Sequence, residues 1–163
     1  QPVDPVLDEE ILDEARRCGS ARNRQPWHLF VAMSPPVRRA LSGHAPYGAF
    51  LADAPVVVVI GLDHERGGAD TELDGGRLTQ SLLRASEDRG LGSCPATFFP
   101  TSADRAVAEI VGAPPGIATR TAVAVGWPAT PPSGRAGRSA IPTGRRRFGD
   151  VVTWVDATPG HRR

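Results

Sequence analysis

Lysine is absent from the sequence, and all 19 basic residues are arginine. This excludes enzymes that form a Schiff base on lysine, use a lysine as general base, or hold phosphates with a P-loop lysine. Cysteine is scarce as well. Cys18 and Cys94 lie far apart and form no CxxC motif, so we expect neither a disulfide framework nor a zinc site.

Long apolar runs are also lacking, and the longest run, at 55–62, has the length of a strand. A membrane-spanning helix needs roughly 20 apolar residues, so no membrane partner is expected. No signal peptide is visible, and we expect a cytoplasmic protein. The formal net charge of +1 gives no general argument for a nucleic-acid partner. No spacing of His, Cys, Asp and Glu predicts a metal site.

Helical and strand patterns alternate along the chain. Val56–Leu62 is a continuous β-branched run, which predicts a strand buried on both faces. Gly75 and Gly76 are poor helix formers at the start of a long helix, so another element is expected to pack closely there. The interleaving indicates an α+β or α/β class with one central sheet. Strands are predicted at 27–33, 56–62, 93–99, 121–127 and 151–155, helices at 4–17, 36–42, 71–89 and 102–111, and a polar linker at 64–70.

The segment that joins the first helix to the first strand is the best candidate for ligand binding. It reads Gly19-Ser20-Ala21-Arg22-Asn23-Arg24-Gln25-Pro26-Trp27. Asn and Gln each carry a donor and an acceptor on one rigid amide, which suits the edge of a flavin's pyrimidine ring. A simple helix-to-strand turn with a core tryptophan also explains these residues, so both interpretations stay open at this point.

Five segments, in order along the chain, resemble the nitroreductase family of FMN enzymes. They are Ser20-x-x-Asn23-x-Gln25-Pro26-Trp27, Asp74-Gly75-Gly76-Arg77-x-x-Gln80, Gly90-Leu91-Gly92-Ser93-Cys94-Pro95, Val123-Ala124-Val125-Gly126-Trp127-Pro128, and Arg145-Arg146-Arg147 followed by Val151-Val152. The resemblance spans residues 2–154. It implies an α+β fold with a central mixed β-sheet flanked by helices, in a domain-swapped homodimer that exchanges C-terminal strands. One domain, 1–156, and a tail, 157–163, are expected.

The resemblance implies that both subunits bind each FMN. A backbone N–H on the flavin-facing strand would point at flavin N5, and an arginine would hold the phosphate through its bidentate fork. No side chain is expected to act as a catalytic acid or base. The residues implied as cofactor-binding are Gly19, Ser20, Ala21, Asn23, Gln25 and Gln80, then Pro95, Ala96 and Thr97 on the strand, and Arg145 or Arg146 for the phosphate.

Three departures from the family pattern affect the expected site. An arginine-rich phosphate contact that usually precedes the segment matching Pro2-Val3 is not in the chain, and we expect it upstream of Gln1. Thr97 and Phe98 stand where members often carry an acidic residue and a glycine. The short 63–70 segment leaves no room for the helices that roof many members' sites, so we expect an open flavin face and broad or bulky substrates.

Three functions remain compatible with the sequence. The first is an FMN-dependent oxidoreductase that uses NAD(P)H as co-substrate and reduces nitroaromatic or quinone-like small-molecule acceptors by a ping-pong mechanism. The second is an FMN-dependent oxidase or dehydrogenase acting on a specialised metabolite. The third is a non-catalytic flavin- or anion-binding protein that uses the arginines between 135 and 147. These arginines lack interleaved aromatics, which argues against nucleic acid.

Overall fold

A computed structural model describes residues 3–128 and 144–155 of the chain. The chain divides into two units, residues 1–129 and 130–163, and each is described by itself. Within the described ranges, no helix has the length and apolar character to cross a bilayer. The same ranges contain no group of three or more His, Cys, Asp or Glu placed to hold a metal ion.

The first unit is built on a four-stranded sheet with strand order β1-β2-β4-β3. Its strands are β1 (Trp27–Ala32), β2 (Val56–Asp63), β3 (Gly92–Thr97) and β4 (Ile117–Gly126). All three ladders are antiparallel. The α+β class is therefore confirmed. The expected mixed sheet differs, because the described strands of this chain form no parallel ladder.

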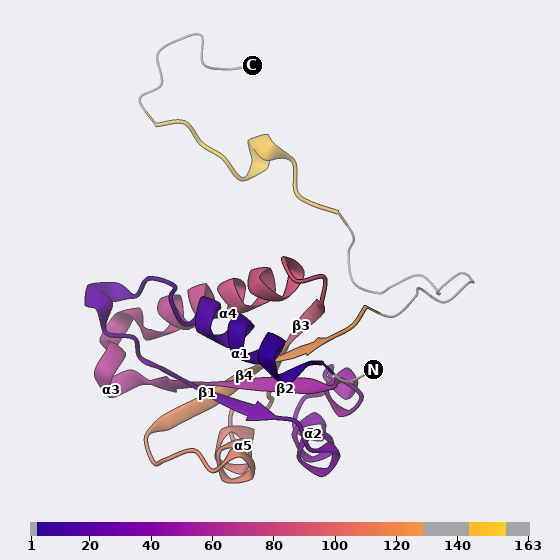
Figure 1. Cartoon of the computed structure of the whole chain (residues 1–163). Coiled ribbons are helices and arrows are strands. Elements are labelled where there is room, and N and C mark those ends of the chain that lie inside the picture. Colours follow the sequence, from indigo (N-terminus) through magenta and orange to yellow (C-terminus); the bar gives the residue numbers. More distant parts are fainter. Residues whose placement is uncertain (1–2, 129–143, 156–163) are drawn as a thin grey trace. The chain divides into compact units, whose positions relative to one another are not determined.

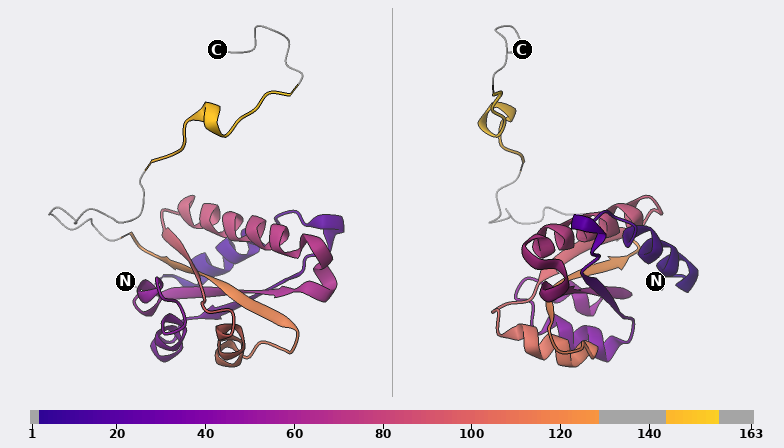
Figure 2. Two further views of the ribbon diagram at one scale, coloured as in Figure 1. Left: turned by 180° about the vertical axis from the view of Figure 1, so that it is seen from behind. Right: turned by 90° about the vertical axis from the view of Figure 1, so that its left-hand side faces the viewer.

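Helices cover both faces of the sheet (Figure 1). One face carries α1 (Pro5–Ala15) and the long α4 (Thr71–Glu87), and the other carries α2 (Pro35–Ser42) and α5 (Ala103–Val111). Figure 2 shows the three layers from the end of the sheet. Each face has its own apolar core, and β2 contributes to both.

Strand β2 confirms the prediction of a strand buried on both faces. Val56, Val58 and Ile60 join the core beneath α1 and α4, whereas Val57 and Val59 join the core beneath α2 and α5. Alternate side chains of a strand point to opposite faces, so a central strand covered on both sides needs apolar residues at every position.

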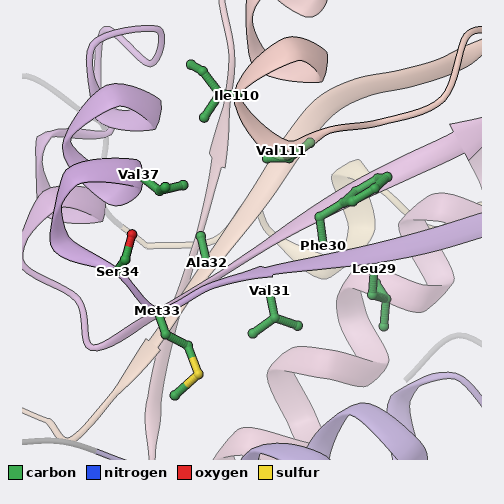
Figure 3. A pocket seen from close by; sticks show the side chains of 9 residues that line it. All are labelled: Leu29, Phe30, Val31, Ala32, Met33, Ser34, Val37, Ile110 and Val111. Atoms are coloured by element: carbon green, nitrogen blue, oxygen red, sulfur yellow. The ribbon is translucent and has the colours of Figure 1, made fainter.

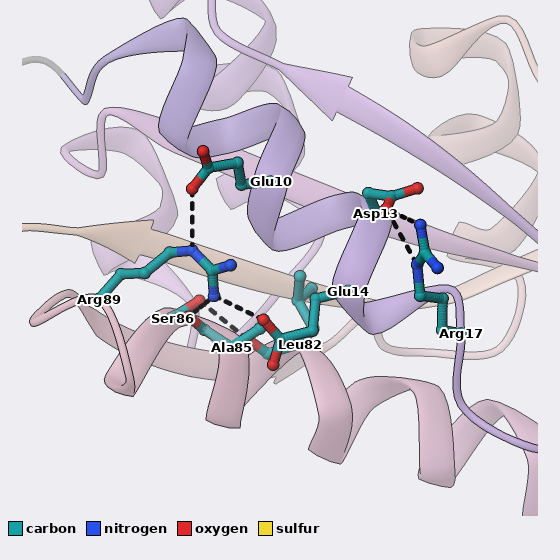
Figure 4. Close-up of polar contacts among 8 residues, drawn as sticks. All are labelled: Glu10, Asp13, Glu14, Arg17, Leu82, Ala85, Ser86 and Arg89. Atoms are coloured by element: carbon teal, nitrogen blue, oxygen red, sulfur yellow. Dashed lines mark hydrogen bonds and ion pairs between the residues drawn. The ribbon is translucent and has the colours of Figure 1, made fainter.

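Arg89, just after α4, ties that helix to α1 (Figure 4). Its guanidinium contacts Glu14 at 2.8 Å and Glu10 at 3.4 Å, and it donates to the Ala85 carbonyl at 3.0 Å. These contacts link α1 to α4. The candidate site lies where α1 ends and α4 begins.

The segment predicted as a polar linker is helical instead. It forms α3 (His64–Gly67) and a 3-10 turn (Gly68–Asp70) that leads directly into α4. Asp63 caps α3, since its carboxylate accepts the Arg66 N–H at 2.9 Å. The segment is too short to show a helical hydrophobic period. The capping residue Asp63 was the only sign of a helix in the sequence. Two further 3-10 turns occupy Ala21–Asn23 and Ala49–Ala52.

In the second unit, the described residues contain one 3-10 turn, Phe148–Asp150. The predicted strand at 151–155 is wrong for this chain, because these residues have no strand geometry. A strand needs a neighbouring strand for its backbone groups, and the described part of this unit offers none. The predicted domain boundary at 156 lies at the edge of the described residues and stays a prediction.

Candidate functional site

The loop Ser20–Gln25, between α1 and β1, has an unusual backbone. Arg22, Asn23 and Gln25 are not glycines, yet their φ angles are 51°, 54° and 49°. L-residues rarely adopt this left-handed region, and each such residue costs about 1–3 kcal/mol unless its surroundings hold it. Three such residues within four positions make this loop a candidate functional site, because strained backbone is concentrated at such sites.

Within the loop, short polar side chains fix the backbone and one another. The Gln25 N–H donates to Ser20 Oγ at 2.9 Å, and Gln25 Nε2 donates to Asn23 Oδ1 at 2.9 Å. Asn23 and Gln25 are both exposed. Their amides therefore form a pre-arranged pair of donors and acceptors that a ligand can reach from solvent.

Helix α3 and the end of β2 anchor the far side of the loop. Arg24 Nη1 donates to the Gly67 carbonyl at 2.7 Å, and Arg66 Nε donates to the Arg24 carbonyl at 2.5 Å. The Asp63 N–H donates to the Pro26 carbonyl at 2.9 Å. The segment predicted as a linker thus has a structural role at the site.

Asp74, in the first turn of α4, anchors the near side. Its side chain is 0% exposed, and its two carboxylate oxygens accept the Ala21 N–H at 2.9 and 3.1 Å. Arg77 Nη1 lies 3.8 Å from the same carboxylate. Arg77 also lies against Gly19, since a Cβ at Gly19 would come within 2.6 Å of Arg77 Nη2. A larger residue at position 19 would displace the guanidinium from this place.

Sequence reasoning did not identify Asp74 and Arg77 as site residues. The segment was singled out as the start of a helix, and an acidic residue in a first turn is ordinarily explained by the helix dipole. The i,i+3 spacing places both residues on the loop side of α4, but the loop lies 53 positions away in sequence from Asp74.

Cys18 precedes the loop and is half-buried. Burial raises the pKa of the Cys18 thiol, and the Ser81 hydrogen bond and the nearby Arg77 only partly oppose this. A thiol that stays protonated is a poor nucleophile, so this cysteine fits a packing role.

Strand β3 presents the second group of predicted flavin contacts. β3 pairs only with β4, so its other edge is open in the described chain. Pro95 and Thr97 are exposed, whereas the Ala96 side chain is buried in the core under α2 and α5. Ala96 can therefore contribute only backbone to a ligand on the exposed face.

The ladder register shows which β3 backbone groups face the open edge. The Phe98 N–H donates to the Arg120 carbonyl at 2.9 Å. Because hydrogen-bonded positions alternate along an antiparallel ladder, Ala96 also bonds to β4, while Pro95 and Thr97 direct their backbone groups outward. Pro95 has no N–H, which is tolerated at an edge. Thr97 is thus the residue among these three that offers a free-edge N–H.

Three other predicted contacts belong neither to the loop nor to β3. Gln80 lies on the exposed face of α4. Arg145 and Arg146 belong to the second unit, where Arg145 Nη1 donates to the Gly144 carbonyl at 3.0 Å and Arg146 Nη2 to the Asp150 carbonyl at 2.7 Å. Their assignment to a phosphate stays a prediction.

The family model described as the nitroreductase family matches residues 42–127. The chain belongs to the nitroreductase family. An Archaeoglobus fulgidus protein named "Putative NADH dehydrogenase/NAD(P)H nitroreductase" is 27% identical over 124 residues, covering 74% of this chain and 71% of that protein. Membership confirms the resemblance and the general class, an oxidoreductase.

Solved structures agree with the fold. A Parabacteroides distasonis protein, also named "Putative NADH dehydrogenase/NAD(P)H nitroreductase", superposes with a TM-score of 0.79 at 19% identity, over 94% of this chain and 87% of that one. An FMN-dependent nitroreductase from Clostridium difficile gives 0.73 at 19% identity, over 93% and 85%. At this identity the likeness establishes the nitroreductase fold alone.

The site of this nitroreductase-family chain fits the ring of FMN. The Asn23 and Gln25 amides match the alternating donors and acceptors of a pyrimidine edge. Gly19 lies against the Arg77 guanidinium at the start of this segment, and the outward Thr97 N–H is a donor on an open strand edge. The predicted ring contacts thus lie in the first unit, and the predicted phosphate arginines lie in the second unit.

Proposed function

We propose that this chain is an FMN-dependent oxidoreductase that takes reducing equivalents from NAD(P)H and passes them to nitroaromatic or quinone-like acceptors. The observation that carries the proposal is the pre-arranged Ser20–Gln25 loop, with its three left-handed residues and exposed amide pair. Family membership supports it. A cytoplasmic location remains a prediction.

The chain's own residues bind and orient in this proposal. Asn23 and Gln25 would hold the pyrimidine edge, the ring would lie beside Gly19, and Arg145 or Arg146 would bind the phosphate. The Thr97 N–H would hold the flavin at N5. Bound FMN would supply the hydride chemistry itself. No acid or base side chain of this chain is required in the proposal.

We further propose that the active form is a homodimer, and the outer face of α4 supports this. Leu73 is 63% exposed on that face. Gly75 is explained within the chain, since a Cβ there would come within 2.8 Å of Leu62 Cδ1, but a Cβ at Gly76 would meet no described atom within 4 Å. A glycine in a helix costs about 1 kcal/mol relative to alanine. Close packing of α4 from a second copy against this face would explain why a glycine stands at position 76.

The edge of the sheet at β1 is the proposed docking site for the C-terminal segment of a second copy. Its outer edge is open in the described chain. A groove of about 490 Å³ lies along it, lined by residues of β1, α2 and α5 (Figure 3). Val31 and Met33 are exposed there. The apolar residues Val151, Val152 and Val155 of a second copy would suit this edge.

Aromatic acceptors are supported by two exposed rings. Tyr47 is 95% exposed and Phe99 is 62% exposed. The Phe99 N–H donates to the His44 carbonyl at 3.0 Å, so the loop that carries Tyr47 is tied to the end of β3, next to Thr97. Exposed aromatic rings beside a flavin would stack electron-poor planar substrates.

The test is a titration of the full chain with FMN, followed by quenching of flavin fluorescence, with riboflavin as the control that lacks the phosphate. We expect saturation at one FMN per chain and riboflavin affinity at least about tenfold weaker. Mass measurement by light scattering should give a dimer. Absence of saturable FMN binding would contradict the proposal and leave the anion-binding interpretation.

A further inference from the structure

We propose that Asp74 is a positioning residue, which holds the Ser20–Gln25 loop in the conformation that receives the cofactor. The inference rests on the proposed function, because it concerns the same loop. It goes beyond that function by assigning a role to a carboxylate that does not itself need to touch the ligand.

The buried carboxylate of Asp74 accepts a hydrogen bond from the loop backbone. A carboxylate that is 0% exposed would be costly to bury without partners. Asp74 has two: the Ala21 N–H at 2.9 and 3.1 Å, and Arg77 Nη1 at 3.8 Å. A charge-assisted hydrogen bond is stronger than a neutral one and gains further in a site shielded from water. The α4 helix therefore holds the loop at one defined point.

The hydrogen bond between Asp74 and Ala21 lies directly beside the strained part of the loop. Ala21 stands immediately before the left-handed pair Arg22 and Asn23, and Arg24, anchored to Gly67, stands immediately after. Strained backbone persists only where its surroundings over-determine it. Bonds on both sides of Arg22 and Asn23 meet that condition, and removal of either leaves the pair free to relax to an ordinary turn.

The Asp74 carboxylate also has a second partner, the Arg77 guanidinium. Arg77 is half-exposed and would otherwise be free to swing into solvent. Attraction to Asp74 keeps its guanidinium against Gly19, directly before the loop. The buried Asp74 carboxylate thus orients both the loop, through the Ala21 N–H, and the Arg77 guanidinium.

The chain offers a matched control in Asp104 on α5. Asp104 Oδ1 also accepts a backbone N–H, from Thr119, and the Thr119 hydroxyl at 2.7 Å. Asp104→Ala therefore removes a comparable carboxylate clamp on the other face of the sheet, away from the loop. Both variants are compared with the wild type for melting temperature, amide hydrogen exchange without FMN, and FMN affinity.

For Asp74→Ala we expect amide exchange across 21–25 to rise by about tenfold or more, and the Kd for FMN to rise by about tenfold or more. Asp104→Ala should lose comparable thermal stability, with loop exchange and FMN affinity within about twofold of wild type. Unchanged loop exchange in Asp74→Ala, or an equal loss of FMN affinity in Asp104→Ala, would overturn the proposal.

A second variant covers the case in which Asp74→Ala does not fold. Ala21→Pro removes the same N–H from the loop side, and Ser20 already has the extended conformation that a following proline requires, with φ −131° and ψ 158°. The same gains in exchange and in Kd are expected. A wild type that binds no FMN would refute the proposed function, whereas the exchange data would still decide whether Asp74 orders the loop.

Discussion

At the scale of single residues, two carboxylates on α1 have opposite consequences for stability. Asp8 is 8% exposed, and its Oδ2 has no hydrogen-bond partner among the described residues. Burial, with a smaller contribution from Asp4, raises the pKa of Asp8. Hydrogen bonds from Arg17 and Arg16 lower the pKa of Asp13. Relative to the unfolded chain, folding thus stabilises the protonated form of Asp8 and the charged form of Asp13.

Replacement of Asp8 by asparagine tests this difference. A raised folded-state pKa gives stability below the unfolded value of 3.8 that is lost as pH rises through the folded value. Asp8→Asn should therefore stabilise the protein at pH 7, with the gain shrinking toward pH 4. Asp13→Asn is the control and should show the reverse trend. Denaturant unfolding across this pH range measures both, and a pH-independent effect of Asp8→Asn would contradict the account.

Thr97 is the second residue whose role can be isolated. Thr97→Pro removes the outward N–H without removing a ladder bond, whereas Thr97→Ala keeps it. We expect Thr97→Pro to slow flavin reduction by NAD(P)H about 10²-fold, as loss of one oriented donor does elsewhere, and Thr97→Ala to stay within about threefold. Stopped-flow absorbance gives the rates. Equal rates in the two variants would show that this N–H does not serve the flavin.

At the scale of elements, what could be predicted depended on how far the signal reaches along the chain. β2 and α4 were predicted because their apolar periods lie within one short window. The left-handed backbone at Arg22 and Asn23 was not, since its anchors come from α3 and from Asp74, far along the sequence. The strand at 151–155 failed for the same reason: an isolated strand has no stability of its own, whatever its pattern.

Helix α4 carries the prediction about assembly. Gly76→Ala should favour the helix of the single chain by up to about 1 kcal/mol, because alanine is the better helix former and no described atom opposes it. In a dimer packed through this face, the added methyl should raise the dissociation constant by about tenfold or more. Arg105→Ala, on the exposed side of α5, is the control and should leave assembly unchanged.

Sedimentation over a range of protein concentrations decides between the outcomes for Gly76→Ala. A weaker dimer with an equally stable chain supports the α4 interface. An unchanged dissociation constant would show that Gly76 lies outside any interface and that its place in the helix needs another explanation.

At the scale of the whole molecule, the chain belongs to the nitroreductase family, and the sheet formed by its described residues has two open edges. β3 offers the Thr97 N–H at one edge, and β1 offers an apolar groove at the other. The strained loop, held by α3 and α4, lies between α1 and β1. The whole connection from β2 to α4 is α3 and one 3-10 turn, so no further helix is inserted between these two elements.

The most direct test of the central claim is the visible absorption spectrum of the FMN-loaded protein, recorded without oxygen before and after addition of NADH or NADPH. The account predicts that the oxidised-flavin band disappears on mixing with at least one of the two nucleotides, and returns when a nitroaromatic or a quinone is added. A band that persists with both nucleotides would contradict the reductase and favour an oxidase that acts on a different donor.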